Sequence, residues 1–295
     1  FEAGDVDMAL GLPVPVTERL RRDSRFNVLQ EVGARQYYIT LNNSRSPTND
    51  VLVRRAINHA VDKQGIINAV FLGVGAEIAR AVYATPIVIG YHEAGFYEYD
   101  PERAGELLDE AGWDMGDDGV RAKDGERLEL SLYTRRGATT GDFETAELVQ
   151  GMLAEVGVAV DLIVLESASF VPAVTVPQEE SQYHMANLTW GTVTGDAEYV
   201  VSTIYRCDSA APRLYNRAYY CNEEVDALSN ASRQVATLEE RNEIYADIFE
   251  IVQDEAPVIQ LFNQTHFVPI SADVHGIYFE PAFSNWPGKY AWKSP

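Results

Sequence analysis

The chain has 295 residues, and its 45 Asp and Glu residues against 23 Lys and Arg residues give a formal net charge of −22 at pH 7. A chain of this length can bury a substantial core and leaves room for two domains. So strong a negative charge repels nucleic acids and anionic membrane surfaces, and we expect neither as a partner. The acidic residues are spread over the whole chain. Because salt screening makes dense like charge tolerable, this distribution favours an organism living in high salt.

The ends of the chain indicate a piece of something larger. The sequence starts at Phe1 without Met, signal peptide or lipid-attachment Cys, and residues 1–12 and 17–26 offer only a turn, a short apolar stretch and an Arg-rich helical piece. No run of about 18 apolar residues occurs, so we expect no membrane-spanning segment.

The first half of the chain predicts two strands followed by helices. Alternating residues predict strands over 27–32 and 36–41. Helices are predicted over 51–61, with Asp50 as N-cap, over 63–71, stopped by Gly73 and Gly75, and from Pro101 to Gly112, with Asp100 as N-cap. Between the last two helices, residues 76–99 read as a long irregular loop.

The second half predicts strands and helices in alternation. A hairpin turn over 116–125 is followed by a strand at 128–133, a helix at 143–156 and a strand at 158–165, which together predict a parallel βαβ unit. Further on we expect a helix at 170–176, a strand at 182–190, a long helix at 238–252 with Ile244, Ile248, Ile251 and Val252 inward, and a strand at 257–267. The class is α/β.

Two positions in this half are candidate ligand contacts. Arg135 and Arg136 follow a predicted strand, and the carboxyl ends of strands in α/β sheets are where ligands commonly lodge. A guanidinium there suits a carboxylate, although both residues could equally be ordinary surface arginines. Trp190 ends another predicted strand and precedes the polar segment Gly191 to Asp196. Its indole is either a platform for a ligand or a packed core residue.

Cys207 and Cys221 are the only cysteines, fourteen positions apart. A disulfide between them would contribute about 3 kcal/mol and would indicate an oxidising compartment. Two unpaired buried thiols are the alternative, since the sequence does not fix their distance.

Enzyme and metal signatures are absent from the sequence. The five histidines have no metal-ligand spacing, and there is no GxSxG elbow, P-loop or GxGxxG. In so acidic a chain a pair of neighbouring carboxylates carries little weight as a glycosidase signal. We therefore expect a binding protein with no cofactor and no metal.

Several segments resemble one family. They are FEAGDVDMA at the start, residues 37–75, YDPERAGELLDEAGW, AELVQGMLAEVGVAV, WGTVTGDAEY with the two cysteines after it, and RNEIYADIFEIVQDEAPVIQLF. In order, they cover nearly the entire chain. They are similar to the family 5 extracytoplasmic solute-binding proteins of ABC importers, the peptide and nickel class, and within it most like dipeptide-binding proteins.

The resemblance implies a type II periplasmic-binding-protein-like fold, with two α/β lobes that close on the ligand. This chain would hold lobe II nearly whole, with N- and C-terminal remnants of lobe I. The implied division is a remnant of lobe I over 1–35, a crossover strand over 36–43, lobe II over 44–256, a second crossover strand over 257–263 and a return segment over 264–295.

The resemblance also implies ligand contacts, Arg136 foremost. In the dipeptide binders an Asp three residues after the Trp pairs with the ligand's ammonium group, but here that position is Val193. A buried ammonium without a counter-charge costs several kcal/mol, so either Asp196 substitutes or the ligand is not held by a free N-terminus. The predicted ligand-binding set is Arg136, Trp190, Gly191, Thr192, Asp196, Arg135 and Thr189.

The implied function is the capture of short peptides outside the membrane and their delivery to the permease subunits. We expect a monomer that is anchored through an N-terminal lipid absent from this chain. A nickel chelate, an opine or an oligosaccharide on the same fold is the alternative, favoured by Val193. An enzyme or a signalling receptor domain on this fold is a third possibility.

Overall fold

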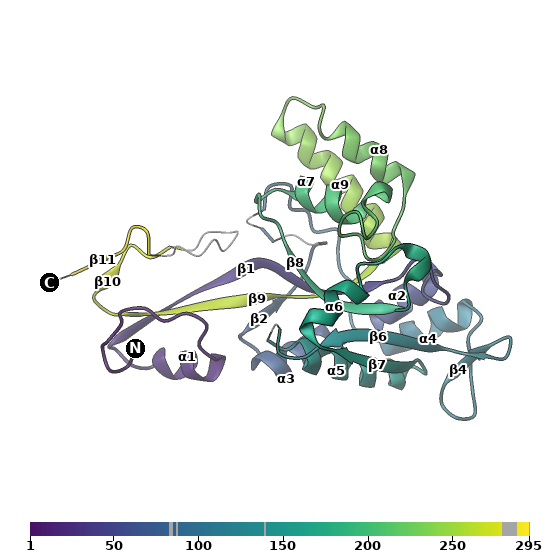
Figure 1. Ribbon diagram of the computed structural model, residues 1–295, viewed down its shortest axis with the longest axis horizontal. Helices are drawn as coiled ribbons and strands as arrows, with labels where there is room; N and C mark the ends of the chain where they lie inside the picture. The colour runs from purple at the N-terminus through teal and green to yellow at the C-terminus, as the bar shows by residue number, and fades with distance from the viewer. Residues whose placement is uncertain (83–84, 87, 139, 279–287, 295) are drawn as a thin grey trace.

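The computed structural model describes residues 1–82, 85–86, 88–138, 140–278 and 288–294. Its centre is a sheet of six strands in the order β2, β9, β1, β8, β6, β7 (Figure 1). These strands are β1 (Phe26–Leu41), β2 (Ala76–Ile78), β6 (Glu129–Arg135), β7 (Ala159–Leu165), β8 (Met185–Gly191) and β9 (Val258–Ser271). β6 pairs in parallel with β7 and with β8, while the other neighbours are antiparallel. The predicted βαβ unit is confirmed.

Strand β1 differs from the sequence prediction. The two strands predicted over 27–32 and 36–41 are one continuous strand, whose pairing with β9 shifts register between Val32 and Gln36. Gly33 lies in this shift, where a Cβ would come within 2.7 Å of Nε2 of His266. A residue without a side chain lets the two strands stay together through the irregularity, so the predicted break does not occur.

One face of the sheet, called here the first face, is covered by four helices. They are α2 (Val51–His59), α3 (Lys63–Phe71), α4 (Pro101–Glu110) and α5 (Asp142–Glu155). The predicted N-caps are confirmed, because Asp50 accepts a hydrogen bond from the backbone N–H of Leu52 and Asp100 accepts one from that of Arg103. Their core is mostly aliphatic, with Leu108, Leu132 and Leu153 fully buried.

The opposite face, called here the second face, is covered by the segment from α6 to α9. It comprises α6 (Ser167–Ala173), the single turn α7 (Ala197–Val200), α8 (Glu223–Ala231) and α9 (Leu238–Glu255), and α7 to α9 form the upper part of Figure 1. The sequence analysis missed α8, whose N-cap is Asn222. In α9, Ile248 and Val252 are buried as predicted, but the helix also buries Tyr245 and Phe249.

Strands β1 and β9 leave the body together as a two-stranded ribbon (Figure 1). Helix α1 (Val14–Leu20) and the short pair β10 (Val274–His275) and β11 (Trp292–Lys293) lie beside its far end. A separate small cluster forms there from Val268, Ile270 and Val274, with Met8, Leu29 and Ile277 against it.

The remaining predictions concern turns and loops. The predicted hairpin is a three-stranded sheet of β3 (Asp114–Met115), β4 (Arg121–Lys123) and β5 (Glu126–Arg127). The loop predicted over 76–99 opens with β2. Its residues 83, 84 and 87, and residues 279–287 and 295 of the predicted return segment, lie outside the described residues. No helix in the described part of the chain is long and apolar enough to cross a membrane.

Candidate functional site

The predicted ligand-binding residues lie where two strands of the sheet end. Because β6 and β8 run parallel, with Tyr133 level with Ala186, their carboxyl ends meet at one edge. On the other side of β8, Trp190 is level with Gln36 of β1, close to the register shift that precedes the ribbon. The edge of the sheet where ligands commonly bind is therefore next to the point where β1 leaves the body.

Trp190 is flanked by two tyrosines. Its ring is stacked at 5.8 Å on Tyr199, with an interplanar angle of 11°, and lies 4.4 Å from the ring of Tyr215, tilted by 50°. The indole Nε1 is buried and has no hydrogen-bond partner among the described residues. Half-buried and packed on the second face, Trp190 is part of the core, which is one of the two alternatives left open by the sequence, and it supports two other aromatic rings. Its role as a platform for a ligand stays a prediction.

The segment after Trp190 is held by its own hydrogen bonds. The Thr192 hydroxyl accepts from the backbone N–H groups of Thr194 and Asp196, both at 3.3 Å, and donates to the Asp196 carbonyl at 3.1 Å. Thr192 is buried, so its side chain shapes this loop instead of facing solvent. The backbone of Gly195 and Ala197 also bonds to Ile89, which joins the loop to the segment following β2.

Asp196 has its own partners. It caps α7 by accepting from the backbone N–H of Glu198 at 2.8 Å, and its carboxylate forms an ion pair with Arg241 of α9. Val193, at the position where the dipeptide binders have Asp, is 69% exposed. The carboxylate nearest in sequence to the missing one is thus already neutralised by an arginine.

The two adjacent arginines after β6 have different surroundings. Nε of Arg135 lies 3.2 Å from a carboxylate oxygen of the buried Asp142, and its guanidinium carbon lies 4.9 Å from the centre of the Phe170 ring. Tyr133 of β6 and Ala186 of β8 lie level with each other in the sheet. Arg135 comes two residues after Tyr133, and Trp190 comes four residues after Ala186. Side chains alternate along a strand, so Arg135 and Trp190 share the second face.

Arg136 is exposed, and its guanidinium carbon lies 3.6 Å from the centre of the Phe143 ring at the start of α5. The structure therefore brings Arg135 to the face of Trp190, while Arg136 lies against the helix that covers the first face. Cation–π stacking of this kind holds a guanidinium in place without using its N–H donors.

Thr189 and Gly191 lie beside Arg35 of β1. Thr189 is level with Tyr37, and its hydroxyl accepts a hydrogen bond from a terminal guanidinium nitrogen of Arg35 at 3.2 Å. Gly191 is level with Arg35 itself, and a Cβ on Gly191 would come within 3.3 Å of the Arg35 Cα. The small residue permits the close approach of β8 to β1 at this point.

His184 precedes β8 and joins three segments. Its Nδ1 accepts from the backbone N–H of Ser131 at 3.0 Å, and its Nε2 lies 3.2 Å from the carbonyl of Ser46 and 3.1 Å from Nε of Arg45. Burial, and then the charge of Arg45, lowers the pKa of His184 to about 4. This imidazole is neutral at pH 7 and serves the sheet as a structural link.

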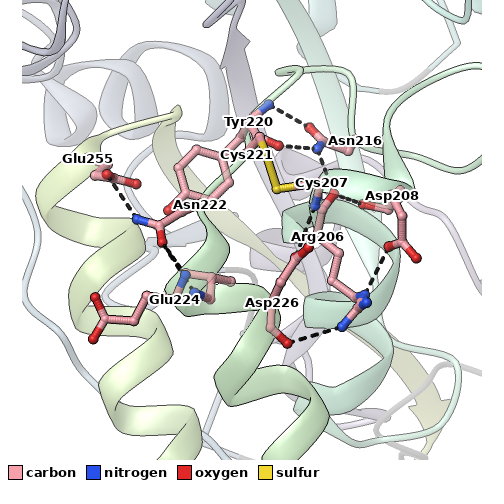
Figure 2. Close-up of a disulfide and its surroundings, with 12 residues drawn as sticks. Arg206, Cys207, Asp208, Asn216, Tyr220, Cys221, Asn222, Glu224, Asp226 and Glu255 are labelled. Atoms are coloured by element: carbon pink, nitrogen blue, oxygen red, sulfur yellow. Dashed lines mark hydrogen bonds and ion pairs between the residues drawn. A yellow bond between two sulfur atoms is a disulfide. The ribbon is translucent and has the colours of Figure 1, made fainter.

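Cys207 and Cys221 form a disulfide, as one of the two sequence alternatives predicted. Figure 2 shows the bond beside the start of α8, with Cys207 N–H donating to Asp226. Asn216 lies inside the closed loop, fully buried, and its side-chain amide donates to the carbonyls of Arg206 and Tyr220 (Figure 2). The loop is thus fixed at both ends and braced internally.

The sequence analysis missed four residues that complete this region. They are Tyr199 and Tyr215, which flank Trp190, Arg217, which lies beside Tyr215, and Arg241, which pairs with Asp196. For Tyr215 and Arg217, the sequence feature that could have indicated them is the high number of arginines and tyrosines between the cysteines, in RLYNRAYY. The described residues contain no cluster of three or more His, Cys, Asp or Glu side chains able to hold a metal ion.

Both the sequence and the fold of this chain are similar to those of known proteins of one family. Residues 1–212 match the model of the bacterial extracellular solute-binding proteins, family 5 middle. The chain is 28% identical over 285 residues to heme-binding protein A of Haemophilus influenzae. The aligned region covers 95% of this chain and 49% of that protein. It is 26% identical over 267 residues to the dipeptide-binding protein of Escherichia coli, covering 89% of this chain and 46% of that protein.

Among solved structures, HbpA2 from Haemophilus parasuis superimposes with a TM-score of 0.87 at 24% identity, over 100% of this chain and 55% of that one. This similarity confirms the predicted type II periplasmic-binding-protein fold. The chain spans about half the length of the curated relatives it matches. On the family match, the chain belongs to the bacterial extracellular solute-binding proteins of family 5.

Proposed function

We propose that this chain holds one lobe nearly whole, with remnants of the other lobe at both ends, of an ABC importer's substrate-binding subunit, which captures short peptides and delivers them to the permease. The observation that carries the proposal is the placement of Arg135 and Trp190 on one face, at the carboxyl ends of β6 and β8. An aromatic platform suits a peptide because it offers apolar contact, and a positive charge beside it favours a ligand that carries a carboxylate. The similarity to a dipeptide-binding protein supports the same ligand class.

Within this proposal the predicted set has different tasks. Arg135, Arg136 and Trp190 contact the ligand with their side chains, and Thr189 contributes a hydroxyl. Gly191, Thr192 and Asp196 contribute main-chain groups and the shape of the loop, since the Thr192 and Asp196 side chains already have partners. Main-chain recognition tolerates varied ligand side chains.

The proposed division of the chain assigns 44–256 to lobe II, 36–43 and 257–263 to crossover strands, and 1–35 and 264–295 to lobe I. Two features support it. Strands β1 and β9 project from the body as a ribbon, and a small hydrophobic cluster separate from the two main cores lies at the ribbon's far end (Figure 1). Lobe I would complete the ligand cavity from the other side.

The setting of the protein follows from the same proposal. The family is extracellular, and we propose a monomer held outside the membrane by a lipid attached N-terminal to this chain. The disulfide fits an oxidising compartment. The net charge of −22 fits a protein adapted to high salt and disfavours nucleic acid as a partner. A binding role, without turnover of the ligand, is part of the proposal.

A nickel chelate, an opine or an oligosaccharide is the second candidate. The observation that favours it is the absence of a carboxylate at Val193 together with the pairing of Asp196 to Arg241. A peptide ammonium would then need a carboxylate other than that of Asp196. Ligands without a free ammonium avoid that requirement.

Calorimetry of the full-length protein with di- and tripeptides, chelated nickel, opines and sugars tests the proposal. We expect heat of binding with peptides, and an absence of heat with every peptide would refute the peptide function. Arg136→Ala should weaken an anionic ligand by about 2–4 kcal/mol if its guanidinium pairs with a carboxylate inside the closed cleft. Unchanged affinity would show that Arg136 is a surface residue stacked on Phe143.

A further inference from the structure

The loop closed by the disulfide carries the most exposed aromatic ring of the site. Trp190 has Tyr199 on one side and Tyr215 near it, at 4.4 Å between ring centres. Tyr215 is 39% exposed, although the five residues that follow it are all buried. Its hydroxyl has no hydrogen-bond partner in the described part of the chain. The ring that Trp190 supports is therefore better placed for a ligand than Trp190 itself.

Two positions further on, the same loop contains an unusual arginine. Arg217 is only 9% exposed, and its Nε and one terminal nitrogen both donate to the hydroxyl of Thr175, at 3.2 Å. Its guanidinium carbon lies 5.5 Å from the centre of the Tyr215 ring. No carboxylate of the described residues lies within 4.0 Å of it. By contrast, Arg206 and Arg213 of the same region both pair with Asp208.

A cation this deeply buried is costly unless a negative group compensates it. The chain has 45 acidic residues, yet none is used here. The backbone around Arg217 is nevertheless firmly held. Asn216, between Tyr215 and Arg217, braces the loop, the Tyr215 N–H donates to the Thr203 carbonyl at 3.1 Å, and the Arg217 carbonyl accepts from Tyr183 at 2.7 Å. The backbone that carries the two side chains is therefore held in place before any ligand arrives.

We propose that Arg217 and the Tyr215 hydroxyl form a subsite for a carboxylate of the ligand, beside Trp190. A guanidinium and a phenol O–H both donate to a carboxylate, and the guanidinium can do so through two nitrogens. In a short peptide the carboxylate comes from the C-terminus or from an acidic side chain. This inference rests on the proposed peptide-binding function, which it makes more specific.

Calorimetry of the full-length protein with a matched set of tripeptides tests the subsite. The set contains a neutral tripeptide with a free C-terminus, the same peptide amidated, and an amidated version with one Glu. Wild type should bind the free acid about 10- to 100-fold more tightly than the amide. If the Glu peptide recovers the affinity, the acidic side chain is also accepted.

The Arg217→Gln variant should lose this preference, binding the free acid about 10- to 100-fold more weakly and the amide unchanged. Tyr215→Phe should show a smaller loss, about two- to tenfold. The matched control is Arg213→Gln, in the same loop, whose side chain is 71% exposed. It should bind both peptides as wild type does.

Each result decides a specific point. If peptides bind and Arg217→Gln affects the free acid and the amide equally, or neither, the subsite is refuted. If wild type binds no peptide at all, the proposed peptide-binding function is refuted. The assignment of a peptide carboxylate to this subsite is then refuted as well. If Arg217→Gln does not fold, Arg217→Lys takes its place, because lysine keeps the positive charge. This variant must still prefer the free acid to the amide. An Arg217→Lys variant that folds normally but shows no preference would overturn the proposal.

Discussion

The two faces of the central sheet are built from different residues. The first face, under α2 to α5, is dominated by Leu, Ile, Val and Ala. Its aromatic members are Trp113, Tyr37, Phe71 and Phe262, and the Phe262 ring packs on those of Tyr37 and Phe71. The second face, under α6 to α9, is rich in tyrosine; the tyrosines of its core are Tyr38, Tyr183, Tyr205, Tyr219, Tyr220 and Tyr245. The two tyrosines beside Trp190 in the described part of the chain, Tyr199 and Tyr215, lie in the segments between β8 and α8 that cover this second face.

The difference shows how one sheet can serve stability and binding at once. Aliphatic side chains bury surface without polar atoms, so the first face contributes stability and little else. Tyrosine buries a large ring and keeps a hydroxyl, so a tyrosine-rich face can pack and still offer polar groups at its edge. We therefore expect substitutions on the first face to change stability and those at the edge of the second face to change binding.

The largest effect should come from the first face. Phe262 is fully buried, with ring centres 4.7 Å from Tyr37 and 4.8 Å from Phe71. Phe262→Ala should lower the free energy of unfolding by about 3–5 kcal/mol, because it leaves a cavity between two aromatic rings. Urea unfolding measures this, with Phe262→Leu as a milder control. A loss below about 1 kcal/mol would mean that the face relaxes around the cavity.

The disulfide should have the next largest effect. Replacing Cys207 and Cys221 together by Ser should lower the free energy of unfolding by about 3 kcal/mol. The two positions are fourteen residues apart, and without the cross-link the loop between them gains conformational entropy in the unfolded chain. Adding reductant to wild type should reproduce the loss in urea unfolding, and the double variant should not respond to reductant. A double variant as stable as oxidised wild type would contradict this account.

The ion pair beside the loop should matter less. Asp196→Asn keeps an oxygen that can cap α7 but removes the charge that faces the half-buried Arg241. We expect a loss of about 1–2 kcal/mol in urea unfolding. The control is Glu198→Gln, which breaks a more exposed pair with Arg233 and should cost about 0.5 kcal/mol or less. Equal losses in the two variants would show that burial of Arg241 is unimportant.

The last effect, which is smallest near neutral pH because it appears only in acid, is a dependence on pH. Since the folded pKa of His184 is about 4, below its ordinary value of 6.5, the unfolded chain binds the proton first as pH falls. The contribution of His184 is therefore complete above about pH 6.5 and is lost as pH falls towards about 4. In urea unfolding over this range, His184→Gln should show a shallower slope of free energy against pH than wild type. An identical slope would mean that the histidine binds the proton equally in the folded and unfolded states.

Much of the local structure could be predicted from the sequence. The caps at Asp50 and Asp100, the parallel pair of strands around α5, the pairing of the cysteines and the family itself all follow from residues close together in the chain. Capping acts over three residues and side-chain alternation over two, so these patterns are present before the chain folds. The continuity of β1 was missed, because its register depends on β9, more than 200 residues away.

What the sequence determined by itself was the α/β class and the family, and it predicted the neighbourhood of the proposed site, from Arg135 to the loop after Trp190. Only the tertiary structure decided which groups are available there. Register between β6 and β8 brings Arg135, and not Arg136, to the face of Trp190. Folding of α9 brings Arg241 to Asp196, and closure of the disulfide loop brings Tyr215 and Arg217. These contacts join residues that are distant in sequence, and no local pattern records them.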